Sequence, residues 1–132
     1  MAIKEFRYKG KPIDELRKLS VKEFAQLVPS RQRRSLIRGF TPSQKLLLEK
    51  IRKNMKVGKG KPIKTHCRNM VIIPELVGVT LSVHNGKDFF TLSITDEMLG
   101  HYIGEFSLTR KKVQHSAPGI GATKSSSAIS VK

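Results

Sequence analysis

The sequence predicts a small α/β (α+β) protein, in which a three-stranded, mainly antiparallel sheet module with short helices follows a helical extension and precedes a basic tail. Apolar residues recur at helical spacing up to about residue 57 and alternate at strand spacing after Ile63. After Phe106 they become sparse among Gly, Ser, Lys and Pro. We therefore expect a basic helical extension over 1–60, the sheet module over 61–109 and a flexible tail over 110–132.

The first part of the extension has the pattern of two short helices. Three apolar residues at three-residue spacing follow Pro12, which suits a first helical position, and they predict a helix near 13–19. Ser20 and Glu23 form the S-x-x-E pattern of a capping box. The apolar face that follows predicts a second helix, which ends at Pro29.

Two further helices are expected before the sheet module. Ser30 is a candidate cap for a third helix that carries four arginines and closes at Gly39, a residue suited to a left-handed helix end. Thr41 and Gln44 form a second capping-box pattern and predict a fourth helix, whose apolar stripe is surrounded by Lys and Arg. The Gly-, Pro- and Lys-rich segment 56–62 cannot bury a core and is interpreted as a linker.

The strongest local signal in the module is Asn85-Gly86. This pair favours a two-residue type I′ hairpin loop, because both central positions need a positive φ. With these residues as the loop, three apolar cross-strand pairs are predicted: Leu81 with Phe90, Val79 with Leu92, and Val77 with Ile94. Thr and Ser fall on the other face of the same hairpin. The apolar run 70–73 predicts a buried strand, and Thr95 is a candidate cap for a short helix.

The charge of the chain favours a polyanionic partner. The 132 residues include 26 Lys and Arg against 10 Asp and Glu, which gives a formal net charge of +16. Basic and acidic side chains number 20 and 5 in residues 1–70, 1 and 5 in 71–106, and 5 and none in 107–132. Cationic arms around a slightly acidic module suit nucleic acid, because each phosphate contact by Lys or Arg releases condensed counterions.

A membrane partner fits this composition less well than nucleic acid does. The apolar stretches are too short to span a bilayer and the basic helices have narrow apolar stripes, so no membrane partner is expected. The start of the chain lacks the apolar region of a secretory signal, and Cys67 has no second cysteine, which favours the cytoplasm.

No enzyme site can be assembled from the sequence. His66 and Cys67 lack the recurring ligand pairs of a zinc site, and as strand neighbours they would point to opposite faces. Segment 119–125 resembles a phosphate-binding loop but has Thr123 where the Gly before Lys is required. No paired general acid and base can be named, so we expect no catalysis, no cofactor and no metal.

Several motifs together resemble a known family. They are Lys61-Pro62-Ile63-Lys64-Thr65, Val77-Gly78-Val79-Thr80, Val83-His84-Asn85-Gly86-Lys87, Ile94, Leu99-Gly100, Gly104-Glu105-Phe106 and Thr109-Arg110. At this spacing they are similar to the signature of the small-subunit ribosomal protein S-nineteen family, over about residues 61–115. The helical N-terminal part and the ending 114–123 resemble the archaeal and eukaryotic branch. Two positions depart from the signature: Ile103 stands where Leu or Phe is usual, and Ser107-Leu108 where Ala-Pro is usual.

The resemblance implies a structural constituent of the small ribosomal subunit in the cytoplasm. It implies binding to small-subunit ribosomal RNA in the head, support of subunit assembly and translation near the decoding site, and a neighbouring protein of the S-thirteen family. It also implies a C-terminal tail that reaches toward the decoding site and its transfer RNA. The residues themselves also fit a second class, a DNA-binding or chromatin-like basic protein, which would use the same cationic arms.

The candidate RNA-contacting residues are mostly cations that would position phosphates without reading sequence. They are Arg31, Arg33, Arg34 and Arg38 on the third helix; Lys59, Lys61, Lys64 and Arg68 at the start of the module; His84, Asn85 and Lys87 at the hairpin; and Arg110, Lys111, Lys112, His115 and Lys124 in the tail. The two histidines and Asn85 could hydrogen-bond or stack on RNA, although the turn alone would also require Asn85.

Overall fold

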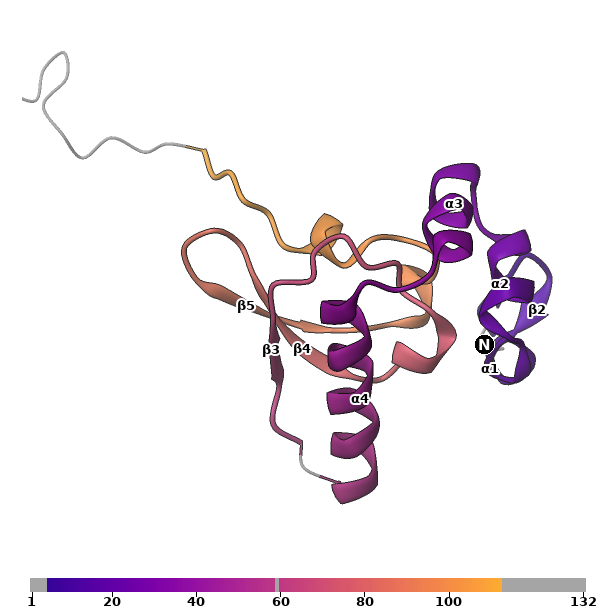
Figure 1. Ribbon diagram of the computed structural model, residues 1–132, viewed down its shortest axis with the longest axis horizontal. Coiled ribbons are helices and arrows are strands. Elements are labelled where there is room, and N and C mark those ends of the chain that lie inside the picture. The colour runs from indigo at the N-terminus through magenta and orange to yellow at the C-terminus, as the bar shows by residue number, and fades with distance from the viewer. Residues whose placement is uncertain (1–4, 59, 113–132) are drawn as a thin grey trace, which may run out of the picture.

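A computed structural model describes residues 5–58 and 60–112 of the chain, and Figure 1 shows one helix along a small twisted sheet and the other helices at one side of it. The helices and strands, in chain order, are β1 (Arg7–Tyr8), β2 (Lys11–Pro12), α1 (Ile13–Lys18), α2 (Val21–Leu27), α3 (Ser30–Arg38), α4 (Pro42–Val57), β3 (Ile63–Thr65), β4 (Thr80–His84) and β5 (Phe89–Ser93). Three short 3-10 helices complete the fold: η1 (Pro74–Leu76), η2 (Asp96–Met98) and η3 (Ile103–Phe106).

Local capping chemistry fixes the helix starts largely as predicted. In the capping box of α2, the Ser20 N–H donates to Glu23 Oε2 at 2.7 Å and the Glu23 N–H donates to Ser20 Oγ at 3.4 Å. Thr41 and Gln44 make the equivalent pair at the start of α4. The expected cap of α3 is wrong, because Ser30 lies inside the first turn and Pro29 occupies the cap position without a side-chain hydrogen bond.

The helix ends and the start of the chain hold two differences from the expectation. Helix α4 continues through Val57 and ends at Gly58 with φ +65°, so the first residues of the expected linker are helical. Strands β1 and β2 form a small hairpin that was not predicted. Its turn residues Lys9 and Gly10 both have positive φ, at 50° and 82°, as a type I′ turn requires. Lys-Gly is a weaker sequence signal for this turn than Asn-Gly, and so it was missed.

The β4–β5 hairpin exists, but its predicted register is wrong by two residues. Leu81 pairs with Leu92 and Val83 with Phe90, so the turn centres on Gly86 and Lys87. Asn85 precedes the turn, where its Oδ1 accepts the N–H groups of Lys87 at 3.0 Å and of Asp88 at 2.8 Å. A shift of two residues keeps every side chain on its predicted face, which is why the apolar pattern could not reveal it.

The sheet has the order β3-β4-β5 and mixes two kinds of pairing. Strand β3 runs parallel to β4, with Ile63 opposite Leu81, while β4 and β5 are antiparallel. The expected strand at 70–73 is buried but irregular, and an isolated bridge joins Val71 to Tyr102. The expected helix after Thr95 is divided into η2 and η3, and Thr95 makes no side-chain cap.

One hydrophobic core joins the helical extension to the sheet. It includes Leu16 of α1, Phe24 of α2 and Ile51 of α4 together with Leu81 and Ile103. In Figure 1, α4 runs alongside the sheet, and α1–α3 gather at the side away from the hairpin turn. The boundary expected near residue 60 therefore does not separate two cores, and the positions of the helices are fixed relative to the sheet.

Candidate nucleic-acid interface

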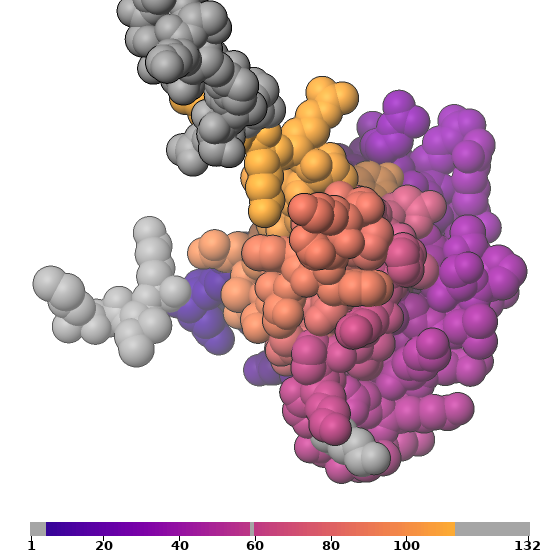
Figure 2. Space-filling view, turned by 90° about the vertical axis from the view of Figure 1, so that its left-hand side faces the viewer, coloured from indigo at the N-terminus to yellow at the C-terminus, as the bar shows by residue number. Residues whose placement is uncertain are grey.

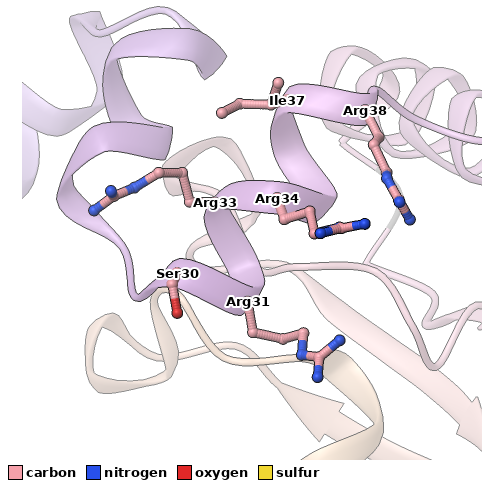
Figure 3. Close-up of a pocket in the computed structure, with 6 residues that line it drawn as sticks. All are labelled: Ser30, Arg31, Arg33, Arg34, Ile37 and Arg38. Atoms are coloured by element: carbon pink, nitrogen blue, oxygen red, sulfur yellow. The ribbon is translucent and has the colours of Figure 1, made fainter.

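Helix α3 presents three of its four arginines together on one side. Figure 3 shows Arg31, Arg34 and Arg38 pointing away from the side to which Arg33 and Ile37 point, as their helical spacing requires. All three are exposed, and the first turn of the helix carries no acidic residue. Together with Ser30, Arg33 and Ile37 they line a shallow hollow of about 700 Å³. This face, Arg31, Arg34 and Arg38, is called the α3 arginine face below.

The α3 arginine face is held in a fixed direction by the rest of the fold. Leu36 is buried in the core on the other side of the helix. The Ser35 hydroxyl lies 2.8 Å from the Tyr102 hydroxyl, a hydrogen bond that joins α3 to the residue before η3. Planar guanidinium groups pair with phosphate oxygens through two parallel hydrogen bonds, so a fixed row of them suits a nucleic-acid backbone.

Arg33 has a different environment from the other arginines of α3. Its Nε donates to the Ala25 carbonyl oxygen at 3.2 Å, and its Nη2 donates to the carbonyl oxygens of Gln26 and Val28, each at 3.3 Å. These are carbonyls at the C-terminal end of α2, which lack partners within their own helix. Arg33 therefore caps α2, and its predicted contact with RNA stays a prediction with this competing role.

Arg68 also binds backbone within the protein. Its Nη1 donates to the His84 carbonyl oxygen at 2.7 Å, and its Nη2 donates to the carbonyl oxygens of Gly104 at 2.8 Å and Ser107 at 2.6 Å. The side chain joins the end of β4 to η3 and to the point where residues 108–112 begin. Of the predicted contact residues, Arg68 is thus the one that most clearly organises the fold.

The remaining predicted cations of the module are exposed. Lys61 precedes β3 and Lys64 lies within it, with its Nζ 5.2 Å from the centroid of the Phe89 ring. Lys87 lies in the hairpin turn. Lys59 lies outside the described residues. Figure 2 looks onto this side of the molecule, where the hairpin lies at the centre and the segment that leads to the tail lies above it.

Helix α4 adds exposed lysines that the sequence-based selection missed. They are Lys45, Lys50, Lys53 and Lys56. Lys50 and Lys53 line a hollow of about 380 Å³ together with Lys61 of the segment that follows the helix. The Lys- and Arg-rich faces of this helix were visible in the sequence. Residues such as Lys50 could have been selected once the apolar stripe had been assigned to the core.

At the hairpin, His84 and Asn85 both have roles in the turn. His84 Nδ1 accepts the Gly86 N–H at 3.1 Å, and Asn85 Oδ1 accepts the two N–H groups described above. In the tail, Arg110, Lys111 and Lys112 are exposed where the described chain ends. His115 and Lys124 lie outside the described residues.

Carboxylates neutralise few of these cations. Among residues 5–58 and 60–112, the ion pair between an arginine or lysine and a carboxylate is that of Arg52 with Glu75, and His101 Nδ1 and Glu105 Oε2 share a hydrogen bond at 2.8 Å. The hydrogen bond from Arg52 holds the pKa of Glu75 below its usual value. The same residues hold no group of three His, Cys, Asp or Glu side chains arranged to bind a metal, and no helix among them is long and apolar enough to cross a membrane.

Comparison with known proteins gives two findings. A family model described as ribosomal protein S19 matches residues 34–115, which include α4, the sheet and most of α3. The chain is also 55% identical over 130 residues to the small ribosomal subunit protein uS19 of Saccharolobus solfataricus. That alignment covers 98% of this chain and 93% of the relative.

Proposed function

Because the chain belongs to the ribosomal protein S19 family, we propose that it is a structural component of the small ribosomal subunit that binds the ribosomal RNA of that subunit. The observation that carries the mechanism is the α3 arginine face, where Arg31, Arg34 and Arg38 are exposed without an acidic neighbour in the first turn of the helix. Such a surface binds phosphates of a folded RNA through charge and shape, and it needs no catalytic group.

The contacts act together because the core fixes their relative positions. One packed body carries the α3 arginine face, the lysines of α4, Lys61 before β3, Lys64 within β3, and Lys87 in the turn. Each contact that neutralises a phosphate adds a similar increment of affinity. A rigid body with many exposed cations binds more tightly than a flexible chain with the same cations, because less conformational entropy is lost on binding. We propose that these residues support assembly of the subunit head by holding RNA segments in place.

The finer partners are proposals that rest on family membership. We propose a position beside the protein of the S-thirteen family in the head of the subunit, on the ribosome and therefore in the cytoplasm. We also propose that the tail from residue 110 onward extends toward the decoding site and its transfer RNA. The exposed Arg110, Lys111 and Lys112, which begin that tail, support a polyanionic partner for it.

The competing proposal is a DNA-binding or chromatin-like protein, and a direct comparison separates the two. The full chain is titrated with small-subunit ribosomal RNA and with duplex DNA of equal phosphate content at matched salt. Preference for the ribosomal RNA, together with co-sedimentation with the small subunit, is the expected result. Preference for duplex DNA would favour the competing proposal, because groove binding needs a duplex of B-form geometry.

A variant of the tail tests its share of the binding. Replacing Arg110, Lys111 and Lys112 with Ala should weaken association with ribosomal RNA and flatten its dependence on salt, since up to three phosphate contacts are lost. Filter binding at four salt concentrations measures both quantities. A slope equal to that of the unaltered chain would show that the tail does not contact the RNA that was used.

A further inference from the structure

Three aromatic rings form a cluster on the surface beside the hairpin turn. The rings of His66 and His84 are stacked, with centroids 4.3 Å apart and an interplanar angle of 29°. The Phe89 ring meets both edge-on, at 5.4 Å from His66 and 4.9 Å from His84. His66 is exposed and 38% of Phe89 is accessible. These three residues are called the ring cluster below.

The ring cluster does not contribute to the hydrophobic core. His84 and Phe89 are cross-strand partners, so they lie on the face of the hairpin opposite to Leu81, Val83 and Leu92, which are buried. Leaving part of a phenylalanine in water forgoes hydrophobic stabilisation, and burial against a partner would recover it. The exposed surface of the cluster is therefore available to a ligand.

The rings are also held in place before any ligand arrives. The ring of His84 is fixed because its Nδ1 accepts the Gly86 N–H at 3.1 Å, and its carbonyl oxygen accepts from Arg68 Nη1 at 2.7 Å. The hydrogen bond at Nδ1 occupies one ring nitrogen of His84 within the turn, and the other ring nitrogen, Nε2, takes no part in the turn. His66 follows directly on β3, and Phe89 begins β5. A preformed aromatic surface loses little conformational entropy when a flat partner stacks on it.

Two cations lie close to the cluster. The Lys64 Nζ lies over the Phe89 ring, 5.2 Å from its centroid, and Lys87 is exposed in the turn two residues before Phe89 in the chain. One carboxylate, Asp88, is close in sequence, and its backbone carbonyl accepts the Asn85 N–H within the turn. Aromatic rings beside ammonium groups are the combination that binds unpaired bases, with the rings stacking on the base and the cations on the phosphates.

We propose that the ring cluster binds an unpaired base of the RNA, with Lys64 and Lys87 on the adjoining phosphates. This proposal rests on the proposed function, and it adds to phosphate neutralisation a site that requires a base outside a helix. Duplex RNA would not occupy it, since paired bases keep their faces within the stack. Figure 2 shows the hairpin at the centre of its face of the molecule, where an RNA loop can approach it.

Two variants and a control of the full chain test the proposal. Phe89→Leu keeps an apolar side chain but removes the ring, and His66→Ala removes an exposed ring. Phe90→Leu is the matched control, because Phe90 is 50% exposed on the other face of the same strand and belongs to no contact of the cluster. Affinity for small-subunit ribosomal RNA is measured over a range of salt, with thermal unfolding of each variant to verify folding.

The expected result separates stacking from charge. Phe89→Leu should weaken binding by about tenfold at every salt concentration and leave the salt slope unchanged, because stacking releases no counterions. His66→Ala should act in the same direction and Phe90→Leu should have little effect. Lys87→Gln should instead reduce the steepness of the plot of log affinity against log salt concentration by about one, because one phosphate contact is lost.

A second measurement does not depend on the folding of any variant. Ultraviolet irradiation of the unaltered chain bound to ribosomal RNA should attach a nucleotide to His66, His84 or Phe89, detected by mass spectrometry. If the chain binds the RNA, but no such adduct forms and Phe89→Leu binds as the unaltered chain does, the ring cluster is not a base site. If the unaltered chain fails to bind the RNA at all, the proposed function itself fails.

Discussion

On helix α3, three arginines extend into solvent, whereas at the junction of β4 and η3 a single arginine binds three backbone carbonyls. Leu36 anchors α3 in the core, and the side chains of the α3 arginine face are exposed. Arg68, in contrast, donates to His84, Gly104 and Ser107 and connects segments that are far apart in the sequence. Arginine therefore supports the fold in one region, and in the other it is exposed where we propose that it binds RNA. Net charge alone does not distinguish these two uses.

Removal of Arg68 should have the largest effect on stability. Arg68→Ala removes a charged donor from three partly buried carbonyls, of which that of Gly104 keeps another donor, the Ser107 N–H. A hydrogen bond from a charged group is worth about 1.5–3 kcal/mol, and the three losses are not additive. We expect the free energy of unfolding to fall by about 3 kcal/mol, measured by urea denaturation. Arg68→Lys should recover less than half, because one ammonium group cannot span three acceptors as a planar guanidinium does.

Arg34→Ala is the matched control for this measurement, since Arg34 is exposed on the α3 arginine face. Substitutions of exposed residues usually change stability by less than about 0.5 kcal/mol. If Arg68→Ala and Arg34→Ala lowered the free energy of unfolding equally, Arg68 would not support the fold more than an arginine of the α3 arginine face does.

The α3 arginine face should dominate the opposite measurement, the affinity for ribosomal RNA. Replacement of Arg31, Arg34 and Arg38 with Gln should weaken binding by about a hundredfold at 0.15 M salt, from roughly fivefold per lost phosphate contact. Thermal unfolding should be nearly unchanged, because these side chains support no other part of the structure that we describe. A variant that binds as the unaltered chain does would place the RNA on another face.

Arg33 and Arg34 are adjacent in the sequence but have different environments, so their substitution compares a role in the fold with a role in RNA binding on one helix. Arg33→Ala removes three hydrogen bonds to the C-terminal carbonyls of α2, and the site is exposed. We expect a loss of about 1 kcal/mol in the free energy of unfolding. The salt slope of RNA binding should change less than it does for Arg34→Gln. A larger change in the salt slope for Arg33→Ala than for Arg34→Gln would show that Arg33 contacts the RNA.

The smallest expected effect concerns the ion pair of Arg52 and Glu75, a third environment for arginine. Because Arg52 lowers the pKa of Glu75 in the folded state, the pair stabilises the fold above pH 4.5, the ordinary value, and this contribution is lost as the pH falls below it through the folded pKa. Exposed pairs are worth less than about 1 kcal/mol. The difference in unfolding free energy between the unaltered chain and Glu75→Gln should therefore shrink toward zero as the pH falls from 7 to 3.

Features that depend on neighbouring residues were predictable from the sequence. The capping boxes at Ser20 and Thr41 and the helix end at Gly39 follow from hydrogen bonds or backbone angles within a few residues. The hairpin was found for the same reason. Its register was not, because a shift of two residues leaves the alternation of faces unchanged and the acceptor role of the Asn85 side chain decided the turn.

Features that depend on distant residues were not predictable. Arg33 and Arg34 are adjacent and identical, and their environments differ because the end of α2 lies on one side of α3. Arg68 appeared to be one more cation in a basic segment, whereas its acceptors are 16 to 39 residues away. The exposed lysines of α4 surround an apolar stripe that is buried in the core, so the sequence pattern of this helix indicates packing more strongly than binding.

The central claim is that exposed cations neutralise phosphates of ribosomal RNA, and the salt dependence of binding by the unaltered chain tests it most directly. We predict that the logarithm of the affinity for small-subunit ribosomal RNA falls linearly with the logarithm of the salt concentration, with a slope of about −5 or steeper. An affinity that hardly changes between 0.05 and 0.5 M salt would contradict the claim, because binding would then release few counterions.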